Sequence, residues 1–135
     1  MPAALVEEAE DLFAELLASQ GEPTLLHGDL HHHNVLAARR EAWLAIDPKG
    51  VVGEPAYDTA ALLHNPVETL KTPRPGKVLE RRIALLSEEL GLDRQRVHGW
   101  GLAQAVLAAY WGLEDGGRVW DEALVFAELL SALRG

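Results

Sequence analysis

The feature that most constrains the fold of this 135-residue chain is a pair of short apolar stretches set between two polar, acid-bearing loops. The first loop, residues 27–34, reads HGDLHHHN, and the second, residues 47–50, reads DPKG. Residues 35–38 and 42–46 are apolar enough to form strands, and the polar residues between them suit a turn. Pairing of these strands would bring the two loops together at one end of a hairpin.

Helical periodicity dominates the rest of the chain. Residues 3–19 repeat apolar side chains at helical spacing and place their acids on the outer face. A further strand is expected at residues 24–27 and a loop at residues 50–55. The remaining apolar patterns predict helices at residues 57–64, 78–90, 94–113 and 119–133. The chain is therefore expected to be one domain, residues 1–135, with an α+β, mostly helical fold in which a small β hairpin carries the two loops.

Composition narrows the classes of partner. The net charge is -9, from 21 acids against 12 lysines and arginines. This balance argues against binding to nucleic acid or to an anionic membrane, and it would suit a cationic small molecule. An acidic surface that serves solubility explains the charge as well. The sequence has no cysteine, no signal segment and no apolar run of the ~20 residues that span a bilayer, so we expect a cytoplasmic setting.

Two acids and one amide in the paired loops have the chemistry of a phosphoryl-transfer site. Asp29 could take a proton from a hydroxyl group. Asn34 lies five residues later, and Asp47 follows the second strand of the hairpin. Amide and carboxylate oxygens are ligands that Mg²⁺ accepts, with phosphate oxygens and water completing its shell. The trio therefore predicts a site where a metal ion bridges nucleotide phosphates.

Four of the six histidines lie in or beside the first loop, at His27, His31, His32 and His33. Imidazole is a common ligand of transition metals, so a metal-binding protein built on these histidines is one alternative. Adjacent residues of an extended chain point to opposite faces, and no thiol completes such a site. We therefore expect His27 to brace the loop through hydrogen bonds, and His31 and His32 to line the approach to Asp29.

Three further features have two readings each. Lys49, two residues after Asp47, could neutralise phosphate charge or be a solvated loop lysine. Asp58 is expected to accept hydrogen bonds from the loop backbone while it starts its helix, and a catalytic role is the alternative. Aromatic residues at helical spacing are more often core than ligand platform, and here these are Trp100, Tyr110, Trp111 and Trp120.

Three segments together resemble a known family. Residues 26–36, 43–50 and 53–60 are similar to the aminoglycoside phosphotransferase superfamily, and the IDPK motif favours its streptomycin 6-kinase and hydroxyurea phosphotransferase branch of antibiotic resistance kinases. The resemblance implies the C-terminal lobe of a protein-kinase-like fold. It also implies transfer of the γ-phosphate of ATP, with Mg²⁺, to a hydroxyl group of a small molecule.

The resemblance also implies residue roles. Asp29 would be the catalytic base, and Asn34 and Asp47 would bind Mg²⁺. Two positions depart from the family pattern, because His33 stands where many relatives carry glycine and Glu54 where aspartate is commoner. The first departure would leave the loop less free to adopt a positive φ.

The nucleotide-clamping part of such a kinase is not recognisable in this sequence. Kinases of this kind have an N-terminal lobe with strands over the ATP phosphates and an anchoring lysine. We therefore expect residues 1–135 to form the catalytic C-terminal lobe alone, with little or no turnover by itself. Uncovered apolar surface would then favour self-association or pairing with the missing lobe. A non-catalytic ligand-binding or interaction module derived from such a kinase is the alternative, and no motif identifies the acceptor.

Overall fold

Helices make up most of the structure, a computed structural model that describes residues 2–116 and 121–134. Along the chain the elements are α1 (Ala3–Ala18), β1 (Thr24–Leu26), the 3-10 helix η1 (His32–Asn34), β2 (Val35–Ala37), β3 (Trp43–Ala45), β4 (Val51–Gly53), α2 (Pro55–Asp58), α3 (Ala60–Leu63), the 3-10 helix η2 (Val67–Lys71), α4 (Pro75–Leu90), α5 (Arg94–Gly116) and α6 (Asp121–Arg134). The expected α+β, mostly helical composition is therefore confirmed. No helix in this part of the chain is long and apolar enough to cross a membrane.

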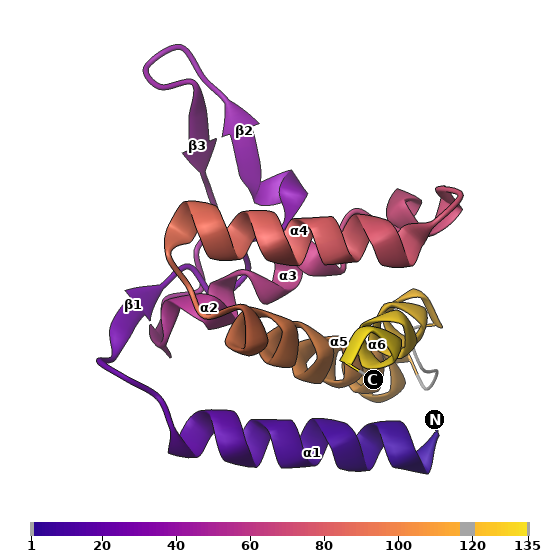
Figure 1. Ribbon diagram of the computed structural model, residues 1–135. Coiled ribbons are helices and arrows are strands. Elements are labelled where there is room, and N and C mark those ends of the chain that lie inside the picture. The colour runs from indigo at the N-terminus through magenta and orange to yellow at the C-terminus, as the bar shows by residue number, and fades with distance from the viewer. Residues whose placement is uncertain (1, 117–120, 135) are drawn as a thin grey trace.

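The strands form two small antiparallel sheets. β2 and β3 make the expected hairpin, with Val35 opposite Ala45, and this hairpin projects from the helical body (Figure 1). β1 pairs with β4, with Leu26 opposite Val51. The expectation of a loop throughout residues 50–55 was wrong, because β4 is a three-residue strand stabilised by a partner far away in sequence. Such a strand has no local periodicity that a sequence could display.

The helix boundaries differ from expectation at one important place. In place of one helix at residues 57–64, the chain forms α2 and α3, which meet at Thr59. The Thr59 hydroxyl donates to the Ala56 carbonyl at 2.7 Å, which competes with a continuous helix. α5 ends at Gly116, three residues beyond its predicted end, and residues 119–120 of the last predicted helix lie outside the described residues.

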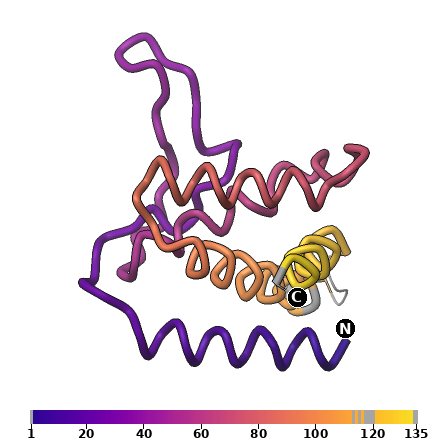
Figure 2. The backbone as a smooth tube through the Cα atoms, in the orientation of Figure 1, coloured from indigo at the N-terminus to yellow at the C-terminus, as the bar shows by residue number. Residues whose placement is uncertain are grey.

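The hydrophobic core surrounds α5. This helix lies between α1 on one side and α4 on the other, and α6 also packs against it (Figures 1 and 2). Trp100 is 2% exposed and packs edge-on against Phe13 of α1 and Tyr57 of α2. Trp100 is thus a core residue as expected. Tyr110 and Trp111 are nearly half exposed, and Trp120 lies outside the described residues.

One partly buried ion pair joins three elements. Glu54, before α2, pairs with Arg96 of α5 and also accepts the Trp100 indole N–H at 2.7 Å. Arg96 donates in addition to the Leu16 carbonyl of α1 at 2.9 Å. The hydrogen bonds from Arg96 hold the pKa of Glu54 below its usual value. This arrangement fixes the start of α2, which carries Asp58, against the rest of the molecule.

Candidate functional site

The loop that carries Asp29 is held by hydrogen bonds from two sides. The backbone N–H groups of His27 and Gly28 donate to the two carboxylate oxygens of Asp58, at 2.8 and 2.9 Å. The His27 ring accepts from the Asp29 N–H through Nδ1 at 3.1 Å. Its Nε2 therefore carries the proton, and it lies 2.6 Å from the Ile46 carbonyl. One imidazole thus links the two acid-bearing loops.

A glycine lets the second loop approach the first. The N–H groups of Lys49 and Gly50 both donate to the His27 carbonyl, at 2.7 and 3.2 Å. Gly28 has φ +86, and a Cβ there would lie 2.7 Å from Val51 Cγ2 and 3.3 Å from Lys49 Cβ. The close approach of the two backbones therefore requires glycine at this position.

The Asp29 carboxylate faces three nitrogen-bearing groups. Its Oδ2 lies 3.5 Å from Asn34 Nδ2, 3.7 Å from His31 Nε2 and 4.0 Å from Lys49 Nζ. The side chain is 34% exposed, so a ligand can reach it. A carboxylate in this position can accept a proton from a bound hydroxyl group.

Asn34 and Asp47 have the donor set for a hard cation. Asn34 is 7% exposed, and its Nδ2 donates to the Asp29 carbonyl at 2.9 Å, which leaves the amide oxygen for another partner. The Ile46 N–H donates to the Asn34 carbonyl at 2.8 Å, so the hairpin ladder delivers Asp47 to the same end. In the described part of the chain Asp47 is the only non-glycine residue with positive φ, at +53. An amide oxygen and an exposed carboxylate fit Mg²⁺.

The histidines of the first loop do not act as one group. His31 and His33 line the cavity beside Asp29, and the Nδ1 of His31 accepts the His33 N–H at 3.2 Å. His32 does not line this cavity; partial burial, and then the charge of Arg82, lowers its pKa. Across residues 2–116 and 121–134, no three His, Cys, Asp or Glu side chains assemble as a metal site. The geometry therefore gives no support to the transition-metal alternative.

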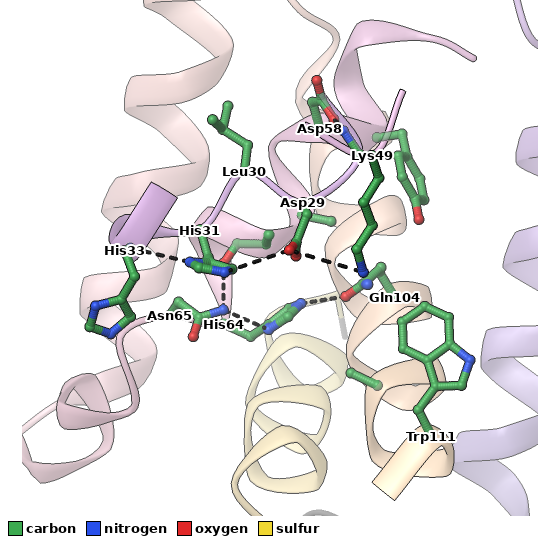
Figure 3. Close-up of a pocket in the computed structure, with 15 residues that line it drawn as sticks. Asp29, Leu30, His31, His33, Lys49, Asp58, His64, Asn65, Gln104 and Trp111 are labelled. Atoms are coloured by element: carbon green, nitrogen blue, oxygen red, sulfur yellow. Dashed lines mark hydrogen bonds and ion pairs between the residues drawn. The ribbon is translucent and has the colours of Figure 1, made fainter. Parts of the chain in front are cut away.

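A cavity of about 340 Å³ opens beside Asp29 (Figure 3). One wall is the loop that carries Asp29, together with Lys49, and the opposite wall is formed by α3 and α5. The residues that line it are Gly28, Asp29, Leu30, His31, His33, Lys49, Tyr57, Asp58, Ala60, Ala61, His64, Asn65, Gln104, Ala108 and Trp111. Its volume is in the range of sites for small organic molecules.

The far wall contains polar residues that sequence reasoning missed. His64, Asn65 and Gln104 come from two segments 40 residues apart, and His64 donates to the Gln104 side-chain oxygen. Burial lowers the pKa of His64. One signal was available, because Gln104 is a lone amide between Ala103 and Ala105 in an otherwise apolar helical stretch. Neither His64 nor Gln104 belongs to a recognisable sequence motif.

Comparison with known proteins places the chain in a family. A family model described as "Aminoglycoside/hydroxyurea antibiotic resistance kinase" matches residues 2–116. The chain is 42% identical over 132 residues to a streptomycin 6-kinase of Streptomyces glaucescens, which covers 97% of this chain and 42% of that protein. It is 41% identical to a hydroxyurea phosphotransferase of Kitasatospora aureofaciens, over 83% of this chain and 31% of the relative. It is 38% identical to a streptomycin 3''-kinase of Klebsiella pneumoniae, over 84% of this chain and 44% of the relative.

The matches cover less than half of these relatives. The aligned part is between 31% and 44% of their length, although it is most of the present chain. No solved structure matches the chain significantly.

Proposed function

Because the chain belongs to the aminoglycoside/hydroxyurea antibiotic resistance kinase family, we propose that it supplies the catalytic residues of an ATP-dependent phosphotransferase whose acceptor is a hydroxyl group of a small molecule. The matches confirm the family that the sequence motifs indicate. The proposed acceptor is an aminoglycoside of the streptomycin type, as the names of two relatives suggest. The proposed architecture is the C-terminal lobe of a protein-kinase-like fold.

The observation that carries this proposal is the placement of Asp29. Its carboxylate borders a cavity of about 340 Å³, and its backbone is fixed through His27 and Asp58. In the proposed reaction the acceptor oxygen attacks the γ-phosphorus of ATP while its proton passes to Asp29. The bond between that phosphorus and the bridging oxygen of ADP breaks, and ADP leaves with the bond electrons.

Three other side chains would handle charge. The Asn34 amide oxygen and the Asp47 carboxylate would hold Mg²⁺, and the bound ion would neutralise charge on the nucleotide phosphates. Lys49 Nζ lies 4.0 Å from Asp29 Oδ2, at the edge where the transferred phosphoryl group would meet the acceptor. We propose that Lys49 neutralises part of that group's charge, and that His31 lies on the acceptor's path to Asp29. His32 does not line the cavity.

The test uses a chimaera of the Streptomyces glaucescens streptomycin 6-kinase, in which the 132 matched residues are replaced by those of this chain. We expect the chimaera to consume ATP when streptomycin is present. Asp29→Asn should lower kcat by about 10²–10⁴-fold, the usual contribution of a general base. Asp11→Asn, an exposed acid on α1, is the matched control and should leave kcat unchanged. A correctly folded chimaera that phosphorylates no hydroxyl acceptor would overturn the proposal.

A ligand-binding module without catalysis is the second candidate. It predicts that Asp29→Asn leaves the affinity for streptomycin unchanged and that the unmodified chimaera has no turnover. The exposed side chains of the strands favour an interaction role in addition, since Leu25 and Val52 of one sheet are 75% and 68% exposed and Trp43 of the other is 67% exposed. Calorimetric titration beside the ATP assay separates binding from catalysis.

A further inference from the structure

One face of α5 forms the wall of the cavity that lies opposite Asp29. Gln104, Ala108 and Trp111 stand at positions i, i+4 and i+7 of this helix, so they share one face. Ala60 and Ala61 of α3 border the same space. The small alanine side chains leave the cavity open between the catalytic loop and the two larger residues of α5 (Figure 3).

Gln104 is held in one orientation. Its side-chain oxygen accepts from His64 Nε2, and the other ring nitrogen of His64 lies 3.3 Å from Asn65 Nδ2. Because the Gln104 oxygen can only accept and the Asn65 amide nitrogen can only donate, the proton of His64 is on Nε2 and its Nδ1 is the acceptor. His64 is 4% exposed, and burial lowers its pKa, so the ring stays neutral near pH 7.

The fixed amide retains hydrogen-bonding capacity. A glutamine side chain has two N–H donors and two acceptor lone pairs. His64 occupies one lone pair. Burial raises the pKa of the Tyr57 hydroxyl, and the nearby Gln104 amide offsets part of that rise. At least one N–H and one lone pair of Gln104 therefore stay available for a ligand at the cavity wall.

Trp111 supplies the apolar part of the same wall. Its side chain is 43% exposed although it borders a cavity, and Figure 3 shows its indole on the α5 side of the space below Lys49. An indole face exposed beside a polar amide suits a ring that has hydroxyl groups on its edge and C–H groups on its face. A molecule of only a few atoms would fill a small part of this cavity of about 340 Å³, so it need not contact this wall when it lies beside Asp29.

We propose that Gln104 and Trp111 are specificity-determining residues that contact a ring-sized, polyhydroxylated acceptor, and that His64 is a positioning residue that orients the Gln104 amide. This inference rests on the proposed function. It predicts that Gln104 and Trp111 contact a ring acceptor such as streptomycin and do not contact a few-atom acceptor such as hydroxyurea.

The kinetic test uses the same chimaera. Gln104→Ala should raise KM for streptomycin roughly fivefold to tenfold, as expected for one lost hydrogen bond, with KM for ATP unchanged. Gln104→Glu, which keeps the size and removes the N–H donors, covers the case in which the alanine variant fails to fold. Trp111→Ala should also raise KM for streptomycin. The matched controls on α5 are Gln95→Ala and Tyr110→Ala, both exposed and outside the cavity, and they should change nothing.

The role of His64 is tested by coupling. If His64 acts by orienting Gln104, the double variant His64→Ala/Gln104→Ala should have the same KM for streptomycin as Gln104→Ala alone. Additive increases in KM would show that His64 does not act through the amide. Circular dichroism of each variant verifies folding.

Direct binding separates this inference from the proposed function. Titration of the 135-residue chain with streptomycin and with hydroxyurea is followed by calorimetry. Weaker streptomycin binding in Gln104→Ala and Trp111→Ala, relative to their controls, supports the inference even if the chimaera is inactive. If both variants bind streptomycin as tightly as their controls, or have the same KM for it, the inference is overturned. Turnover by the chimaera would still support the proposed function in that case. If the two variants weaken hydroxyurea binding as much as they weaken streptomycin binding, the inference is also overturned.

Discussion

Replacing Gly28 with alanine should destabilise the protein by more than the strain of its backbone alone. Gly28 has φ +86, and a Cβ at this position would lie 2.7 Å from Val51 Cγ2 and 3.3 Å from Lys49 Cβ. A side chain in the left-handed region costs about 1–2 kcal/mol. An added methyl group without space costs about 1–3 kcal/mol more. The expected loss in the free energy of unfolding is therefore about 2–5 kcal/mol.

Gly91→Ala separates the two contributions. Gly91 ends α4 with φ +64, and no atom lies within 4 Å of the position that a Cβ would occupy there, so this variant has the strain without the clash. The gain from reduced freedom of the unfolded chain is the same in both variants and cancels in the comparison. The difference between them should therefore be about 1–3 kcal/mol, which is the cost of crowding Val51 and Lys49.

Urea unfolding followed by circular dichroism measures both variants against the parent chain. Domains of this size have about 5–15 kcal/mol of stability, so both losses are measurable. If Gly28→Ala costs no more than Gly91→Ala within about 0.5 kcal/mol, the close approach of the two loops does not require glycine and the reasoning fails. In the chimaera, Gly28→Ala should also lower kcat, because it displaces the loop that carries Asp29.

Three further predictions concern stability and association. Because burial lowers the pKa of His64, the unfolded state binds the proton more readily, so stability should fall as the pH drops below about 6.5, by at most about 1.4 kcal/mol per pH unit. His64→Gln should flatten that slope in urea titrations at pH 7 and pH 5, and an unchanged slope would exclude His64 as the cause. Arg96→Ala leaves Glu54 buried without its partner and should cost about 3 kcal/mol in the same assay, whereas a loss below about 1 kcal/mol, as for a surface pair, would contradict the buried role. The 135-residue chain should self-associate in sedimentation velocity, and Trp43→Ser together with Leu25→Ser should reduce this; a concentration-independent monomer before substitution would refute it.

Local signals predicted a good part of the fold. The predicted helix end at residue 90 and helix start at residue 94 are confirmed, because Gly91 adopts φ +64 after α4 and Asp93 accepts the Arg96 N–H at 3.1 Å before α5. The β2–β3 hairpin was equally predictable, because a turn joins two adjacent apolar stretches. The division between α2 and α3 at Thr59 was not predicted, since it depends on which carbonyl one hydroxyl contacts.

Long-range pairing accounts for the other differences. β4 exists because Val51–Gly53 meets Thr24–Leu26, and neither segment signals the other. The pair Glu54 and Arg96 likewise joins parts of the chain that have no sequence relation. Pattern reasoning detects periodicity within a segment, whereas these contacts depend on where the core places whole elements.

The sequence by itself determined the family and the chemistry of one side of the candidate site. Asn34 and Asp47 flank the two strands of one hairpin, and Asn34 contacts Asp29 in the loop before it, so these placements follow from local folding. Only the tertiary structure decided what faces them. Packing of α5 against α3 places Gln104 and Trp111 across a cavity from Asp29. That arrangement depends on the burial of apolar helix faces that come from distant segments, and no sequence motif marks such faces as partners. For this reason the sequence alone leaves the acceptor undetermined.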